Sequence, residues 1–398
     1  MFPLLSLALP LLFAQSARAD ADDTFNIVPS ISVMHDDNLF RLSSGVDPQT
    51  VLGKSTKADD ITVSSLAFKI NKPYSLQRFE LEASLVDYRY KNFSYLSYRS
   101  QPYKAAWRWS LTPRLHGNLT TDHTTSLNNF TDYTGYTRRN THTNENTRFD
   151  GVADIGASWH LLGGLSRATI TNSELTVGEG DSRVNRAEFG IRHTTPSGSA
   201  LSVVTRSGRG NYINRSDPLP ATLIDNRFDD SENEVRVLWP ITGKTSIDGR
   251  LAHFKRKHAH FAERDFDGAV GNINVNWQIS AKSFLTVGVA RELSSYQTNN
   301  TNYTSTDRLT VVPLWQISAK TALRGRYDYA RRDYVGGSAL GSSSNRSDTV
   351  RTAMIALEWQ PYRTLSLNSS IQNEKRSSNQ PGLDYASTVY SVAAQMTF

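Results

Sequence analysis

Residues 269–282 read AVGNINVNWQISAK, and this stretch decides the fold class. Small or apolar residues occupy the odd positions from 269 to 277, and asparagines occupy positions 272, 274 and 276. Successive side chains of a β-strand point to opposite sides, so a period of two predicts a strand with one apolar and one polar face. The WQISAK segment that ends the stretch predicts a short turn at 279–281.

The same alternation recurs along the chain, in 323–332, 363–376 and 386–398 for example. Helical spacing fits none of these segments. The turn segment is itself repeated, because WQISAK occurs at both 277–282 and 315–320. Alternating segments of about ten residues, separated by turn residues, are the sequence signature of a transmembrane β-barrel.

Two kinds of connection join the predicted strands. Short turns are predicted near 72–76, 111–113, 162–165, 196–198, 241–243, 279–281, 317–319 and 360–362. Longer polar stretches, rich in Asn, Ser, Thr, Gly and Asp, are predicted to be loops at 36–59, 92–100, 125–145, 178–182, 214–229, 257–265, 297–304, 335–347 and 376–384. Eight turns and nine loops connect 18 strands. We therefore expect an all-β fold, a transmembrane antiparallel up-and-down β-barrel of about 18 strands, with short periplasmic turns and longer extracellular loops.

The composition excludes several other classes of protein. The chain has 398 residues, 44 Lys+Arg and 38 Asp+Glu, and a formal net charge of +6. No run of 18 apolar residues follows residue 20, which excludes a bundle of transmembrane helices. Cysteine is lacking, which excludes disulfides and thiolate metal sites. The mild charge, without long basic runs, predicts no nucleic acid partner.

The first residues predict a targeting segment. Residues 2–14 are apolar, and Ala17-Arg18-Ala19 places small residues at the −3 and −1 positions of a cleavage site. This pattern is typical of a secretory signal peptide, although no Lys or Arg precedes the apolar run. We expect a cleaved signal peptide over 1–19 and a single outer-membrane barrel domain over 20–398.

Tryptophan marks one end of the predicted barrel, because each indole lies next to a predicted short turn. Amphipathic indoles prefer the headgroup level of a membrane, so these residues predict an aromatic girdle at the periplasmic interface. A soluble propeller or solenoid with a repeat near 40 residues is the alternative, but the strongly polar inner faces disfavour it. The predicted girdle residues are Trp107, Trp109, Trp159, Trp239, Trp277, Trp315 and Trp359.

The polar faces of the strands are predicted to line the lumen. A barrel of 18 strands is too wide for side chains to fill, so a channel is expected. Charges of both signs offer the weak, repeated contacts that conduction requires. Tyr88 and Tyr90 are predicted to lie on the lumen face of their strand. There they either stack on sugar rings or complete an aromatic girdle near the outer rim. The hypothetical substrate path is formed by Arg108, Arg148, Asp154, Arg186, Glu188, Arg192, Glu234, Arg236, Asp248, Arg250, Arg308, Arg324, Arg326 and Asp328.

Catalytic and metal-binding patterns are weak. Gly243-Lys244-Thr245 looks like the end of a phosphate loop, but position 238 is leucine where such a loop needs glycine. His258 and His260 share a strand face beside the basic run 255–257, where contact with lipopolysaccharide phosphates is the preferred interpretation and a metal the weaker one. We expect no enzyme activity, no cofactor and no metal.

The ends of the mature chain resemble known families. Phe398 closes an alternating strand, as in the C-terminal signal that the barrel insertion machinery of bacteria reads. Residues 24–42 read TFNIVPSISVMHDDNLFRL, and the segment 37–41 within them, the W-x-x-S-x-K turns and the terminal Phe resemble the EpsL-type exopolysaccharide biosynthesis outer-membrane proteins, a putative β-barrel porin 2 group. That resemblance implies an outer-membrane conduit for exopolysaccharide that works with a periplasmic Wza-like export protein.

Three functions follow from these observations. The first is a barrel that exports an exopolysaccharide, whose partners are the polysaccharide chain, outer-membrane lipids and lipopolysaccharide, the insertion machinery and the Wza-like protein. The second is a general or substrate-selective porin for small solutes. The third is a structural or enzymatic barrel, or a soluble β-protein. A porin usually folds one long loop inward as a constriction, and the longest candidates here are 36–59 and 125–145. Neither is dominated by one charge sign, which mildly favours the passage of a polymer.

Overall fold

The protein folds almost entirely into β-strands. The computed structural model describes residues 24–128, 130, 137–174, 180–214, 225–298, 301–336 and 345–398, so the predicted signal peptide lies outside the described residues. No helix among these residues is long and apolar enough to cross a membrane. The short helices are α1 (Pro48–Leu52), η2 (Ser94–Leu96) and η3 (Ala262–Arg264). The strands are β1 (Phe25–Asp36), β2 (Asp59–Tyr74), β3 (Gln77–Tyr90), β4 (Tyr98–Ser100), β5 (Tyr103–Thr112), β6 (Leu115–Leu127), β7 (Thr141–Asp154), β8 (Trp159–Asn172), β9 (Ser182–Thr194), β10 (Ala200–Tyr212), β11 (Arg227–Thr242), β12 (Thr245–His258), β13 (Phe266–Gln278), β14 (Ser283–Thr298), β15 (Thr301–Ser318), β16 (Thr321–Val335), β17 (Ser347–Tyr362), β18 (Leu365–Ser378) and β19 (Tyr385–Met396).

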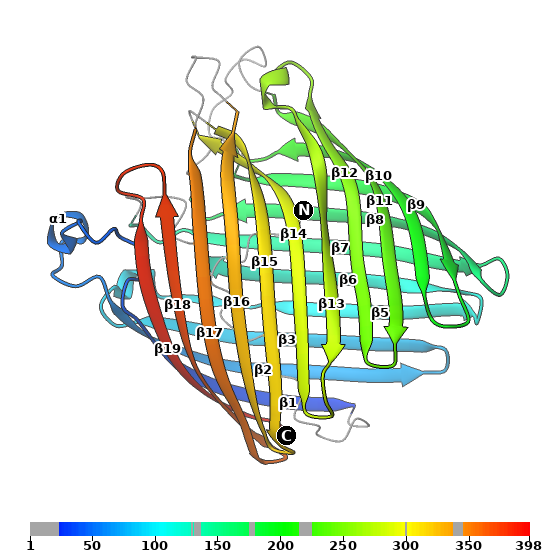
Figure 1. Cartoon of the computed structure of the whole chain (residues 1–398), viewed down its shortest axis with the longest axis horizontal. Coiled ribbons are helices and arrows are strands. Elements are labelled where there is room, and N and C mark those ends of the chain that lie inside the picture. The colour runs from blue at the N-terminus through cyan, green and yellow to red at the C-terminus, as the bar shows by residue number, and fades with distance from the viewer. Residues whose placement is uncertain are drawn as a thin grey trace.

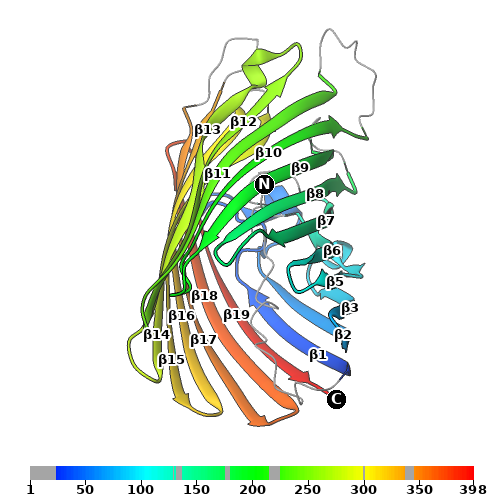
Figure 2. The same ribbon diagram turned by 90° about the vertical axis from the view of Figure 1, so that its right-hand side faces the viewer.

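These strands form one closed antiparallel barrel. Each strand pairs with its neighbour in sequence, and β1 pairs with β19 to close the ring. The three-residue β4 pairs with β3 at the rim, so 18 of the 19 strands build the wall. Figures 1 and 2 show the tilted strands of the front wall crossing those of the back wall. The predicted 18-stranded barrel is therefore confirmed, and closure leaves no open sheet edge in the lipid.

The two ends of the barrel differ as the sequence predicts. Short turns join the strands at one end, such as those between Thr242 and Thr245 and between Ser318 and Thr321. Phe398 lies at this short-turn end, where it exchanges two backbone hydrogen bonds with Ile27. The other end carries the long loops, including 37–58 with α1.

One predicted turn is wrong. The connection between β7 and β8 lies between Asp154 and Trp159, not at 162–165, and Ile155 donates its backbone N–H to the carbonyl of Trp159 across it. Gly163 and Gly164 suggested a turn, but both pair with β7 inside β8. Trp159 therefore begins a strand after the turn rather than preceding one.

One predicted loop is also wrong. The sequence predicts a polar loop at 297–304, but β14 continues to Thr298 and β15 starts at Thr301. Thr298 and Thr301 pair with each other, so the hairpin continues through this polar stretch. Polar composition alone does not distinguish a loop from a strand.

The outer face of the wall is apolar at mid-height. Leu201, Val203, Val235 and Leu251 are each at least 41% exposed, and the register places Val203 opposite Val235 and Val235 opposite Leu251. Directly opposed residues share one side of a sheet, so these side chains form a belt that faces outward. The residues of the other parity in these strands therefore face the lumen.

Candidate functional site: the inner wall of the barrel

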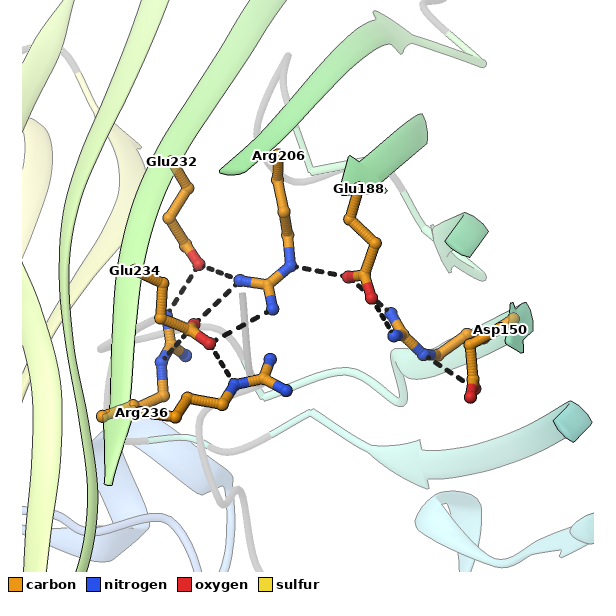
Figure 3. A network of polar contacts seen from close by, with 8 residues as sticks. Asp150, Glu188, Arg206, Glu232, Glu234 and Arg236 are labelled. Carbon is orange, nitrogen blue, oxygen red and sulfur yellow. Dashed lines mark hydrogen bonds and ion pairs between the residues drawn. The ribbon is translucent and has the colours of Figure 1, made fainter. Parts of the chain in front are cut away.

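A ladder of charges crosses the inner wall from β7 to β12 (Figure 3). Glu188 on β9 accepts hydrogen bonds from Arg148 on β7, at 2.9 Å, and from Arg206 on β10, at 2.8 Å. Arg206 also donates to Glu234 on β11 at 2.8 Å, and Arg250 on β12 forms an ion pair with Glu234 at 2.8 Å. Cation and carboxylate alternate, so each charge stabilises its neighbours across the strands.

The ladder has branches that use the same alternation. Glu232 accepts a hydrogen bond from Arg250 at 2.9 Å, and it also pairs with Arg206. Asp150 receives a weaker bond from Arg148 at 3.3 Å. Arg236 pairs with Glu234, whose side chain is fully buried beneath the three guanidinium groups that surround it. The arrangement is a rigid, polar surface with both signs of charge presented in close succession.

The first link of the ladder crosses a whole strand, because Arg148 and Glu188 lie on either side of β8. Gly164 lies directly opposite Glu188 in the register. A Cβ atom at Gly164 would lie 3.1 Å from both Cγ and Oε1 of Glu188. The glycine therefore leaves the space through which the two side chains meet.

A second inner cluster ties the ladder to the long-loop end of β11 and β12. Asp230 accepts hydrogen bonds from Arg256, at 2.8 and 3.0 Å, and from Arg186, at 2.8 Å. The guanidinium of Arg256 also lies 3.8 Å from the ring centroid of Phe228. Asp230, Arg256 and Phe228 are almost fully buried. A buried carboxylate flanked by two arginines satisfies the charges that the lumen wall would otherwise leave unpaired.

An apolar cluster occupies the inner side of β2 and β3 near the long-loop end. Ile61, Val63 and Val86 of the wall are buried there against Leu39, Phe40 and Leu42 of the first loop. The cluster also contains Phe93, Leu96, Leu127 and Phe130. The first loop therefore folds three apolar side chains against the inner side of the wall.

Aromatic packing gives this cluster a defined geometry. The ring of Phe40 lies 4.7 Å from that of Phe93, edge to face, and 4.5 Å from that of Phe130. Tyr88 stacks on Tyr98 with centroids 4.5 Å apart. Tyr88 and Tyr90 thus have the predicted lumen orientation, but they pack against the cluster rather than stand free to stack on sugars.

The opening motif at 37–41 anchors the first loop. Arg41 donates to both carboxylate oxygens of Asp36, at 3.0 and 2.8 Å, and forms an ion pair with Glu374 at 3.4 Å. The amide of Asn38 bonds the backbone carbonyls of Leu42 and Ala386, both at 2.8 Å. These bonds join the loop to β1, β18 and β19, so they hold Leu39 and Phe40 at the inner wall.

The remaining residues of the predicted substrate path also lie on the inner face of the wall, but they lie apart from the ladder. Arg108 pairs with Glu80 at 2.9 Å. Arg324 pairs with Glu358 at 3.0 Å, and Arg326 with Asp328 at 2.5 Å. Three further predicted residues contact neighbours on the inner face: Asp154 contacts His160, Arg192 contacts Ser202, and Asp248 contacts Asn274 and Asn276. Arg308 lies on the same face of β15, half-buried.

The tryptophans take two positions at the short-turn end. Six of them, all except Trp109, are 40 to 52% exposed. Trp109 is buried because its ring lies over Gly117 and Gly151 of the next two strands and stacks on Phe149 at 5.6 Å. For the six exposed rings, the aromatic girdle stays a prediction. Trp109 instead covers the part of the sheet where Gly117 and Gly151 have no side chains.

No metal centre forms within the part of the chain that the structure describes. His258 turns inward and its Nε2 lies 3.0 Å from the hydroxyl of Tyr212, whereas the Nδ1 of His260 lies 2.8 Å from Asp225. The two histidines therefore have separate partners. Sequence reasoning missed the apolar cluster, although Leu39, Phe40 and Phe93 in otherwise polar stretches were its signal.

Comparisons with known proteins agree with this architecture. A model of the family described as Putative beta-barrel porin 2 matches residues 254–398. No curated protein matches the chain in sequence. The structure of OpdK from Pseudomonas aeruginosa with vanillate is 10% identical, with 94% of this chain and 99% of that chain covered and a TM-score of 0.52. OccK2 (OpdF) from the same organism is 11% identical, with 94% and 98% covered and a TM-score of 0.53. A BenF-like porin from Pseudomonas fluorescens is 10% identical, with 95% and 99% covered and a TM-score of 0.51.

These likenesses show the fold, a closed 18-stranded barrel of the outer-membrane porin type. The outward apolar belt and the polar inner wall are what such a barrel presents to lipid and to water. The chain is accordingly an integral β-barrel of the bacterial outer membrane.

Proposed function

We propose that this protein is an outer-membrane channel for small polar solutes, which pass along the charge ladder of the inner wall. The observation that carries the proposal is the ladder itself, Arg148–Glu188–Arg206–Glu234–Arg250, inside a closed barrel. Most of its charge is neutralised internally, so a passing solute finds hydrogen-bonding groups without one strong trap. Such weak, repeated sites suit conduction, and the mixed signs predict weak charge selectivity.

The apolar cluster supports small solutes over a polymer. Leu39, Phe40 and Phe93 pack tightly against the inner wall, and their exposed fractions are 3% or less. A wall segment that carries packed loops narrows the lumen on the β1–β6 side. A porin commonly has a loop folded inward in this way, whereas a long hydroxylated chain needs a clear passage.

The resemblance to EpsL-type proteins implies instead an exopolysaccharide conduit with a Wza-like periplasmic partner. The comparisons favour the porin interpretation, because a BenF-like porin shares the fold over 95% of this chain. The motif that suggested the resemblance, at 37–41, has a sufficient structural role as the anchor of an inward loop. Vanillate accompanies OpdK in one similar structure, so small aromatic carboxylates are the first solutes to test.

We further propose that the long-loop end faces the cell exterior and the short-turn end the periplasm. Outer-membrane barrels of this type have short periplasmic turns and longer extracellular loops. An epitope inserted after Val51, which is exposed in α1, should be labelled by antibody on intact cells. An epitope in the turn at Gly243 should be labelled only after permeabilisation.

Planar bilayers containing the purified barrel test the channel. Discrete conductance steps, together with vanillate uptake into proteoliposomes, are expected. Sealed bilayers and impermeable proteoliposomes would overturn the proposal. A deletion strain provides the opposing measurement: loss of extracellular polysaccharide with its accumulation in the periplasm would favour the export conduit instead.

A further inference from the structure

The outer face of β10, β11 and β12 carries a concentration of positive charge near the long-loop end. We call Arg209, Arg227, Lys255 and Lys257 the outer basic patch. They alternate with inner residues along their strands, and the register places Arg209 opposite Asp229 and Asp229 opposite Lys257. Directly opposed side chains share a face, so the patch is one continuous surface on the outside of the barrel.

The patch surrounds a depression of about 500 Å³. Arg209, Arg227 and Lys257 line it, together with Asn185, Asn211 and Asp229. Among the described residues that line it, the one acid is exposed and weakly paired, because Asp229 is 76% exposed and lies 4.0 Å from Arg209, which is 92% exposed. Within the described part of the chain, no carboxylate forms an ion pair with Arg227, Lys255 or Lys257. The depression therefore presents cations and amide donors to its surroundings.

On the inner face of β12, by contrast, the neighbouring cation is neutralised. Arg256, between Lys255 and Lys257, points inward and is held by Asp230 at 2.8 and 3.0 Å. The basic run at 255–257 thus consists of one neutralised lumen residue and two outward lysines. An outer surface whose cations are at most weakly paired favours an anionic ligand outside the barrel.

The height of the patch indicates which anion it meets. Arg209 lies six residues beyond Val203 of the apolar belt along β10. At roughly 3.3 Å per residue and a strand tilt of about 40°, this places it roughly 15 Å above the belt. Phosphates carried on the sugar head of a glycolipid reach that level, and a ring of basic residues beside a membrane attracts them.

We propose that the outer basic patch binds the phosphate groups of a lipopolysaccharide molecule whose acyl chains lie against Val203, Val235 and Leu251. The proposal rests on the orientation inferred above, with the long loops outside, but not on what the channel conducts. The asparagines at 185 and 211 donate hydrogen bonds to the sugar hydroxyls or phosphates. Charge–charge attraction supplies the affinity, so binding weakens with added salt.

The test uses the purified full-length barrel in a zwitterionic detergent, with lipopolysaccharide as the probe. The triple variant R209Q/R227Q/K257Q should bind it roughly 150-fold more weakly than the wild type, because each surface cation contributes about a factor of five or six. A matched control, R291Q/R331Q/R351Q, removes three outward charges elsewhere. Arg291 and Arg331 are already paired with Asp307 and Asp333, so the control should change the affinity less than threefold.

Two further readouts keep the outcomes distinct. Enzymatically dephosphorylated lipopolysaccharide should bind the wild type as weakly as intact lipid binds the triple variant. Both variants should conduct like the wild type in bilayers free of lipopolysaccharide, which shows that the barrel is folded. Equal affinity of wild type and triple variant, an equal loss in the control, or indifference to dephosphorylation would overturn the proposal. If the protein binds lipopolysaccharide but does not conduct ions, the proposed channel function is wrong and the proposed binding of lipopolysaccharide stands.

Discussion

The basic residues on the inner and outer faces of β10 to β12 differ in their ion pairing and in their exposure. On the inner face Arg206, Arg250 and Arg256 each meet a carboxylate within 3 Å, and their side chains are 2 to 22% exposed. On the outer face of β10, three residues beyond Arg206, Arg209 is 92% exposed and its carboxylate partner, Asp229, lies 4.0 Å away. The same residue types thus form a closed network on one side and an open surface on the other.

The difference follows from what each face has available. The crowded inner face offers little water to Arg206 or Arg256, so a guanidinium there is stabilised only if a carboxylate lies within hydrogen-bonding distance. The outer face near the long-loop end meets water and lipid headgroups, which solvate a cation without help from the protein. Charge removal should accordingly be costly inside and nearly neutral outside.

The largest effect is expected at Glu234. Its side chain is fully buried and pairs with Arg206, Arg236 and Arg250. Glu234→Gln preserves the shape but removes the carboxylate that pairs with Arg236 and one of those that pair with Arg206 and Arg250, which should lower the free energy of unfolding by about 3 kcal/mol. Urea unfolding in detergent micelles, followed by tryptophan fluorescence, measures the change.

An exposed pair provides the control for Glu234. Arg291 and Asp307 face outward with exposed fractions of 54% and 48%. Asp307→Asn should change the free energy of unfolding by less than about 1 kcal/mol, since water screens such pairs. Equal costs at Glu234 and Asp307 would show that the two faces do not differ as described.

The next largest effect extends the comparison from charge to apolar packing. Phe93→Ala removes a ring that is 1% exposed and packs 4.7 Å from Phe40. The free energy of unfolding should fall by about 3 kcal/mol, and single-channel conductance should rise because a ring's volume returns to the passage. Tyr95→Ala, at a residue that is 49% exposed, is the control and should change neither quantity appreciably. A destabilised Phe93 variant with unchanged conductance would place the cluster outside the conducting path.

Two adjacent glycines test the inner face at a finer scale. A Cβ atom at Gly164 would lie 3.1 Å from Glu188, whereas one at Gly163 would have nothing within 4 Å. Gly164→Ala should displace the Glu188 carboxylate, cost about 1 kcal/mol and alter the ion selectivity of the channel. Gly163→Ala should be neutral or slightly stabilising. Reversal potentials under a salt gradient distinguish the two variants, and identical values would show that Gly164 is not needed for the ladder.

The faces of the strands could be predicted from the sequence because alternation is a local property. The period of two predicted the inner position of Glu188, Glu234 and Arg250, and the ladder required only that neighbouring strands be in register. The pairing of Arg148 with Glu188 across β8 could not be predicted. It depends on Gly164, which looked like a turn residue when only its own neighbours were considered.

The contacts that hold the first loop inward could not be predicted from the local sequence, for a different reason. Leu39 and Phe40 pack against Leu127 and Phe130, far along the chain, and the loop is held by Asn38 bonding the carbonyl of Ala386. Such contacts exist only once the barrel is closed. From the sequence, 36–59 could be named only as one of the two longest candidates for an inward loop, beside 125–145.

The smallest effect is expected at the rim, where the two faces meet in the loop 259–265. Asp225 is buried and accepts hydrogen bonds from the backbone N–H groups of His260 and Phe261 and contacts the ring of His260. Burial opposes ionisation of this carboxyl, but these hydrogen bonds outweigh it and hold the pKa of Asp225 below its usual value. A carboxyl with a lowered pKa in the folded state stabilises the loop at every pH above its ordinary value near 4, and this contribution is lost as the pH falls through the lower folded value. Hydrogen-exchange protection factors of His260 and Phe261 should therefore be constant from pH 7 to about 5 and fall below that range. In Asp225→Asn they should be low at every pH, while amides within β12 stay protected throughout. Protection that is unchanged by the substitution would mean that the loop is held by its own 3₁₀ turn, and that the rim needs no buried carboxylate to separate the closed inner network from the open outer surface.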